Sequence, residues 1–125
     1  MSMEIDISVE PDHVCLRCTG TYSLPEAKRV CQSAVDAALL YQKAKVLIDV
    51  NGVIGNISTL DRYTNSVFLA ELVVGRASGR ICRISIAGHV PLIDEDRFGE
   101  TVAVNRGVNA KVVTSLDEAI AWLTR

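Results

Sequence analysis

The stretch Lys45-Val46-Leu47-Ile48-Asp49-Val50 decides the fold class of this chain. It is short and rich in β-branched side chains, and it ends at Asn51-Gly52, as expected for a strand buried on both faces of a parallel sheet. Apolar residues recur at helical spacing on both sides of it, over residues 23–41 and 58–76. A buried strand between two helices predicts an α/β protein in which right-handed crossovers join parallel strands.

The same alternation of strands and helices continues outward to both ends of the chain. Apolar and polar residues alternate over residues 3–9 and 14–18 around a Pro11-Asp12 turn, which predicts an antiparallel hairpin. Further strands are expected near residues 81–86 and 111–114, with helices over 94–106 and 115–123. The order ββαβαβαβα predicts a mixed five-stranded sheet flanked by helices, with the hairpin as its antiparallel edge.

Serines followed three residues later by an acid mark the starts of helices. The pairs are Ser23 with Glu26, Ser58 with Asp61 and Ser115 with Glu118. In this pattern the serine hydroxyl accepts a hydrogen bond from a free backbone N–H of the first turn. The acidic run at residues 94–96 is expected in the first turn of the third helix, where it would interact favourably with the helix dipole.

The composition predicts a single domain over residues 1–125 with its own core. The chain is 49% apolar and 22% charged, which excludes a disordered or collagen-like chain. Its 13 basic residues are outnumbered by 15 acidic ones without any basic run, so we expect no nucleic-acid partner. The first residues lack the pattern of a signal peptide, and no apolar run approaches the ~20 residues that span a bilayer. We therefore expect a cytoplasmic chain without membrane insertion.

The four cysteines predict neither a redox pair nor a metal site. Cys15 and Cys18 have C-x-x-C spacing, but along a strand their side chains point to opposite faces, whereas a redox pair needs a helix N-terminus. Cys31 and Cys82 are too isolated to complete a zinc site. The glycines of residues 52–55 lack a phosphate-binding fingerprint, so we expect buried thiols, no metal and no cofactor.

Polar residues are expected where the parallel strands end, at the edge where open α/β sheets bind ligands. Asp49, Ser58 and His89 are the residue types of a hydrolase triad, and an esterase is a minor alternative. Ser58 lacks the G-x-S-x-G elbow and is better explained as a helix cap, so we expect no enzyme. The candidate ligand contacts at this edge are Asp49, Gly52, Gly55, Asn56 and His89.

The helix over residues 58–76 carries more apolar residues than one buried face needs. One stripe is expected to be buried on the sheet: Leu60, Tyr63, Val67, Ala70 and Val74. The apolar residues off that stripe are a candidate interface: Phe68, Leu69, Leu72 and Val73. In so small a domain the expected partner is a second copy of the chain, which predicts a homodimer.

Two parts of the chain resemble a known family. The run Val46-Leu47-Ile48-Asp49-Val50-Asn51-Gly52-Val53, with Ser58-Thr59 opening a helix after a short loop, resembles the STAS domain (sulphate transporter and anti-sigma factor antagonist). Its SpoIIAA-like branch is also similar in Arg97-Phe98-Gly99-Glu100, in Asn105-Arg106-Gly107 and in residues 117–123. The resemblance implies a mixed sheet flanked by helices and a non-catalytic regulatory module that binds a protein partner.

The resemblance also implies a switch. In anti-sigma factor antagonists of this family, a partner kinase phosphorylates a serine at the start of the second helix, and the added charge releases the bound partner. The corresponding residues are Ser58 and Thr59, with Ile57 in place of the family's acid and Leu60 in place of its glycine. Other members bind ligands or resemble lipid-binding domains of the CRAL-TRIO type, so the alternative is a small-molecule or lipid-sensing domain.

Overall fold

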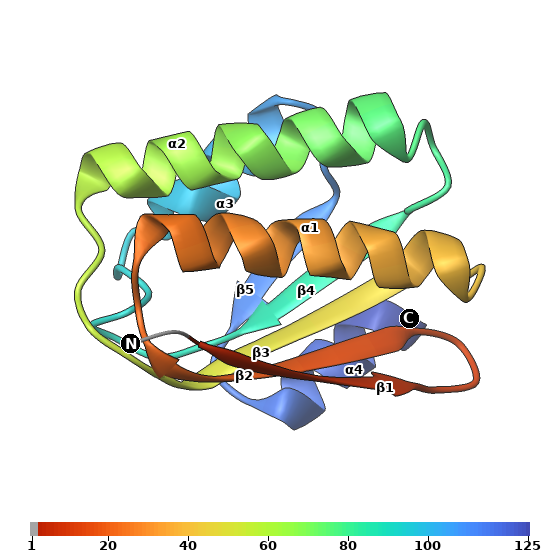
Figure 1. The fold of residues 1–125 in the computed structure, drawn as a ribbon, viewed down its shortest axis with the longest axis horizontal. Helices are drawn as coiled ribbons and strands as arrows, with labels where there is room; N and C mark the ends of the chain where they lie inside the picture. The colour runs from red at the N-terminus through yellow and green to blue at the C-terminus, as the bar shows by residue number, and fades with distance from the viewer. Residues whose placement is uncertain (1–2) are drawn as a thin grey trace.

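A five-stranded mixed sheet in the order β1-β2-β3-β4-β5 forms the centre of the computed structural model, which describes residues 3–125 (Figure 1). β1 (Glu4–Val9) and β2 (Val14–Thr21) form an antiparallel hairpin. β3 (Lys45–Ile54), β4 (Arg83–Ala87) and β5 (Ala110–Val113) continue the sheet in parallel. The predicted element order and the antiparallel edge are confirmed.

Four helices cover the two faces of this sheet. α1 (Leu24–Leu40), α2 (Thr59–Ala70) and α3 (Phe98–Asn105) lie on one face, and α4 (Leu116–Thr124) lies on the other (Figure 1). A π-helical segment, η1 (Glu71–Arg76), continues α2. The larger core therefore lies between the sheet and α1–α3, and a smaller one, with Leu47 and Leu123 fully buried, lies against α4. Within residues 3–125 no helix is both long enough and apolar enough to cross a membrane.

The predicted serine caps are confirmed, whereas the predicted start of the third helix is wrong. The Oγ atoms of Ser23, Ser58 and Ser115 accept backbone N–H bonds at 3.4, 3.1 and 3.1 Å. α3 begins at Phe98 rather than at residue 94, because Arg97 adopts a left-handed conformation with φ 53° that breaks the helix before it. The acids of residues 94–96 thus precede the helix, and the Asp94 carboxylate caps it by accepting the Phe98 N–H at 3.1 Å.

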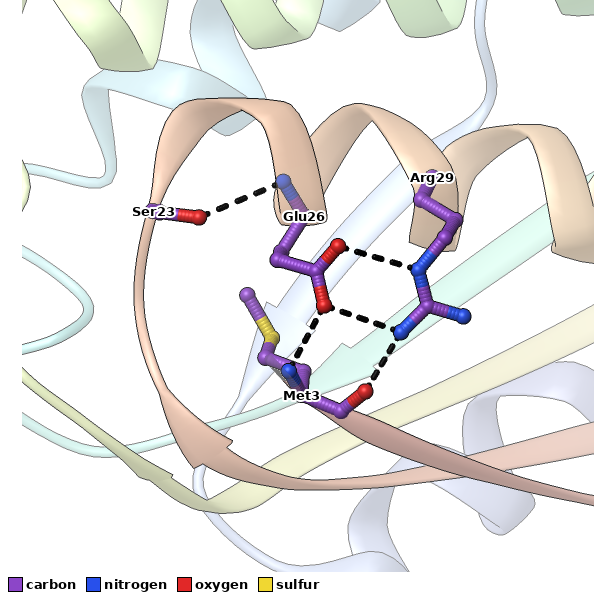
Figure 2. Close-up of polar contacts among 4 residues, drawn as sticks. All are labelled: Met3, Ser23, Glu26 and Arg29. Carbon is purple, nitrogen blue, oxygen red and sulfur yellow. Dashed lines mark hydrogen bonds and ion pairs between the residues drawn. The ribbon is translucent and has the colours of Figure 1, made fainter. Parts of the chain in front are cut away.

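Glu26 joins the start of β1 to the start of α1 (Figure 2). Its Oε1 accepts the Met3 N–H at 2.7 Å, and the Arg29 guanidinium donates to both of its carboxylate oxygens at 3.0 and 3.1 Å. Arg29 also donates to the Met3 carbonyl. The hydrogen bond from Arg29 lowers the pKa of Glu26, with a further contribution from Met3. The first described residue of the chain is thereby held against α1.

The predicted burial of the second helix is confirmed for Ala70, which is 4% exposed, but is wrong for most of the other positions. Leu69 and Val73 are each 5% exposed and belong to the core, and Phe68 and Leu72 pack against it. The outward side chains come instead from the stripe expected to be buried: Leu60 (71% exposed), Tyr63 (42%) and Val74 (52%). Because α2 lies against α1 and α3, it buries the face toward those helices. The wider turn of η1 then shifts the later side chains relative to α-helical spacing.

β1 is an open edge of the sheet with a different character on each face. Its apolar residues face α1, where Met3 is buried but Ile7 and Val9 are 47% and 44% exposed. Glu4 and Asp6 are exposed on the opposite face. Since α4 packs against β3, β4 and β5, the acidic face of β1 has no helix over it.

Candidate functional site

Ser58 and Thr59 lie exposed at the N-terminus of α2. The Asp61 backbone N–H donates to Ser58 Oγ, and the Asp61 carboxylate accepts a hydrogen bond from the Tyr22 hydroxyl at 3.1 Å. Burial, together with this hydrogen bond, raises the pKa of Tyr22, so the phenol stays a donor. The loop is thus anchored to the end of β2, and its two hydroxyl residues face solvent.

Two exposed apolar side chains flank these hydroxyls in the sequence. Ile54 at the end of β3 is 67% exposed, and Leu60 in the first turn of α2 is 71% exposed. We call Ile54, Ser58, Thr59 and Leu60 the switch surface. This surface combines two exposed hydroxyls with two exposed apolar side chains that lie near them in the sequence.

The structure brings only part of the candidate ligand edge together. Gly55 and His89 line an open cleft of about 280 Å³, whose other walls include Ile54 and Val90. Asn56 is exposed outside this cleft. Gly52 instead allows β3 to lie close to β2, because a Cβ at this position would lie only 2.8 Å from Thr19 Cγ2.

Asp49 is turned away from this cleft. It shares a face of β3 with Leu47, which packs against α4. Its carboxylate lies 3.6 Å from Arg17 Nε and accepts the Asn51 N–H at 3.0 Å. Within residues 3–125, neither this carboxylate nor Ser58 Oγ hydrogen-bonds to His89, so the triad residue types are not joined into a triad.

The cysteines are four free thiols. Cys15 packs toward α4 and Cys18 toward α1, which confirms that the C-x-x-C side chains point to opposite faces. Burial raises the pKa of Cys18 to about 11 and of Cys31 to about 12. The expectation of burial is wrong for Cys82, which is exposed because it lies in the loop before β4. In the described part of the chain, no group of three or more His, Cys, Asp or Glu side chains could hold a metal ion.

A partly open cavity of about 150 Å³ lies between the sheet and α1–α3, and sequence reasoning missed it. Its floor includes Ile48, Ile86 and Val112 from three adjacent strands. Its roof includes Val30, Leu69 and Ala103 from the three helices. The only signal in the sequence is the small side chain at some inward positions such as Ala103, and a small residue alone does not reveal an unfilled space.

Charged residues lie on one side of this cavity. Arg62 Nη1 lies 3.6 Å from Asp94 Oδ1 and donates to the Leu92 carbonyl at 2.7 Å. Glu100 Oε1 accepts the Val112 N–H at 2.5 Å. Arg97 Nε is buried and has no hydrogen-bond partner among residues 3–125. Arg62, Asp94 and Glu100 each have a hydrogen-bond or ion-pair partner within residues 3–125. The guanidinium of Arg97 has none there.

Two solved structures share this arrangement over nearly the whole chain. A structure described as an anti-sigma factor antagonist from Mycobacterium paratuberculosis is 13% identical, with a TM-score of 0.62 over 99% of this chain and 96% of that chain. An uncharacterised protein with a SpoIIAA-like fold from Shewanella loihica PV-4 is 19% identical, with a TM-score of 0.57 over 98% and 94%. No family model and no curated protein matches the sequence.

These comparisons define the class of the chain as an α/β protein. More particularly, its fold is the SpoIIAA-like fold that the sequence resemblance implied.

Proposed function

We propose that this chain is a cytoplasmic, non-catalytic regulatory module that binds a protein partner through the switch surface. The observation that carries the proposal is the exposure of Ser58 and Thr59 together with that of Ile54 and Leu60, two apolar residues near them in the sequence. The anti-sigma factor antagonist with the same fold supports a regulatory role over a catalytic one.

Phosphorylation would act on this surface through charge. A phosphate on Ser58 adds a charge of about −1.5 to −2 beside the apolar side chains, and burying it under a partner carries a desolvation cost. It also lies close to the Asp61 carboxylate, which repels it. The phosphate oxygens still accept the Asp61 N–H, because a helix N-terminus favours an anion. A partner kinase would therefore release the bound protein without unfolding α2.

Photo-crosslinking in the host tests this proposal. A benzophenone amino acid at position 60 should give one discrete protein adduct, and Ser58→Asp should remove that adduct while Ser58→Ala keeps it. The control position is Ile120 on α4, which is 37% exposed on the opposite face of the sheet. The proposal fails if both positions give the same adducts, or if the adduct at position 60 persists in Ser58→Asp.

We also propose that the chain forms a homodimer through the outer side of α2, η1 and α3. The exposed apolar side chains there are Tyr63, Val74 and Val104. Arg106 stacks 5.5 Å from the Tyr63 ring centroid and donates to its hydroxyl at 2.8 Å, which holds the ring in place. Sedimentation velocity should show a dimer that Val74→Glu converts to a monomer. A wild-type monomer at high concentration contradicts this proposal.

A second candidate function is small-molecule or lipid sensing at the open cleft between β3 and the loop that follows β4. The favouring observation is its volume of about 280 Å³ at the edge where such sheets bind ligands, with Gly55 and His89 in its wall. Native mass spectrometry of protein purified from its host should then find a stoichiometric small molecule. Val90→Trp should displace that molecule by filling the cleft, and retention of the molecule in this variant contradicts the assignment.

A further inference from the structure

We infer that the partly open cavity between the sheet and α1–α3 is a binding site for a small apolar monocarboxylate, held through the guanidinium of Arg97. The inference goes beyond the proposed function, since neither Ser58 nor Thr59 lines this cavity. It adjoins the edge cleft, with which it shares Val50, Val53 and Leu92, but that cleft contains neither Arg97 nor any α2 or α3 residue.

The volume of the cavity sets the size of the ligand. An apolar cavity of about 150 Å³ accepts a molecule of the size of benzene. A ligand of roughly six to ten non-hydrogen atoms therefore fits, such as benzoate or hexanoate. A long-chain fatty acid would have to extend out of this space into solvent.

The lining determines the chemistry of the ligand's body. The surface of the cavity is almost wholly apolar, with Ile48, Ile86 and Val112 below and Leu69 above. Water beside this apolar part of the lining lacks the two to four polar partners that hold a buried water in place. An apolar ring or a short alkyl chain gains the contacts that the empty space lacks.

Arg97 determines the chemistry of the ligand's head. A buried guanidinium N–H without an acceptor is costly, and Arg97 Nε is such a group within the described residues. The left-handed backbone of Arg97 is itself strained, and Asp94 supports it by accepting the Arg97 N–H at its carbonyl at 3.1 Å. A carboxylate satisfies this donor, because the planar guanidinium and carboxylate groups match in geometry.

The neighbouring groups favour one negative charge rather than two. Asp94 and Glu100 both line the cavity, and they repel a dianion such as a phosphate. Asn65 supplies a second donor: its Oδ1 accepts from Cys31 Sγ at 3.6 Å, which leaves its amide N–H groups without a partner among residues 3–125. Arg62, the other cation of the lining, lies 3.6 Å from Asp94. One unpaired cation and one amide suit a monocarboxylate.

Calorimetric titration of the full chain tests the inference. Benzoate and hexanoate should bind with one-to-one stoichiometry and raise the melting temperature. Benzyl alcohol, hexanol and acetate should bind at least about tenfold more weakly, because each lacks either the charge or the apolar body. Arg97→Gln should weaken benzoate binding by about ten- to a hundredfold, whereas Arg125→Gln, an exposed arginine that does not line the cavity, should leave it unchanged.

A second variant tests the role of the cavity independently of the charge of Arg97. Ala103→Leu keeps Arg97 and fills the roof of the cavity, so it should abolish binding of both benzoate and neutral benzene. The inference is overturned if Arg97→Gln binds benzoate as tightly as the wild type, if Ala103→Leu still binds benzoate, or if neither carboxylate binds at all. Failure at this site leaves the proposal for the switch surface standing, since that proposal is tested by crosslinking at position 60.

Discussion

Leu69→Ala and Leu60→Ala together test the burial of α2. Both positions carry leucine on the same helix, but Leu69 is 5% exposed and Leu60 is 71% exposed. The phase expected from the sequence would bury Leu60 and expose Leu69. The structure therefore predicts opposite consequences for the same chemical change.

The expected magnitudes follow from burial. Removing the Leu69 side chain beyond Cβ withdraws apolar surface from the core, and the new space joins the existing cavity of about 150 Å³ that Leu69 already lines. Because the neighbouring side chains cannot close in to fill this enlarged space, we expect a loss of about 3 kcal/mol in the free energy of unfolding. Leu60→Ala should cost no more than about 0.5 kcal/mol. For a chain of this length the first change lowers the melting temperature by about 10 °C.

Urea denaturation followed by circular dichroism measures both effects. The slope of unfolding free energy against urea should stay the same in both variants, so that the shift in midpoint reports stability alone. Equal losses in the two variants, or a loss below about 1 kcal/mol for Leu69→Ala, would refute the assignment of the buried face.

Three further predictions concern the cap, the thiols and the acid response. Ser58→Ala should lower the unfolding free energy by about 1 kcal/mol and Ser58→Asp by much less, because aspartate also caps a helix; equal losses would contradict the cap seen at 3.1 Å. With a thiol-reactive disulfide reagent, exposed Cys82 should react fast, and this one equivalent should be absent in Cys82→Ser. Cys18 and Cys31 should react only after unfolding, because burial raises their pKa values to about 11 and about 12. The Arg29 hydrogen bond lowers the pKa of Glu26 in the folded state, so its stabilisation is present above the unfolded value near 4.5 and is lost as the pH falls through the folded one. The urea midpoint of Glu26→Gln should therefore fall less than that of the wild type between about pH 7 and about pH 3, and parallel curves would count against this role.

Local patterns explain why most of the fold could be predicted from the sequence. The buried run of β3 and the serine caps at Ser23, Ser58 and Ser115 depend on neighbours within four residues, so they are visible in the sequence itself. The start of α3 could not be predicted in this way. It depends on the left-handed conformation of Arg97. A glycine in the sequence would suggest such a conformation, but an arginine does not.

The same difference between local and long-range contacts decides which parts of the candidate site could be predicted. The hydroxyls of Ser58 and Thr59 were placed at a helix start because the cap is local. The buried face of α2 was missed because it depends on which elements pack around the helix, and α1 and α3 are distant in sequence. The cavity was missed for the same reason: its walls come from three strands and three helices, and no single segment carries its outline.

The open edge of β1 bears on the risk that copies of this chain aggregate through their sheets. An unpaired edge strand with apolar side chains such as Ile7 and Val9 is a template on which further chains could add as strands and grow into fibrils. Two β1 edges that paired would lie about 5 Å apart and would bring Glu4 and Asp6 of both chains together. Like charges at that spacing repel, so this edge carries its own protection against fibril growth.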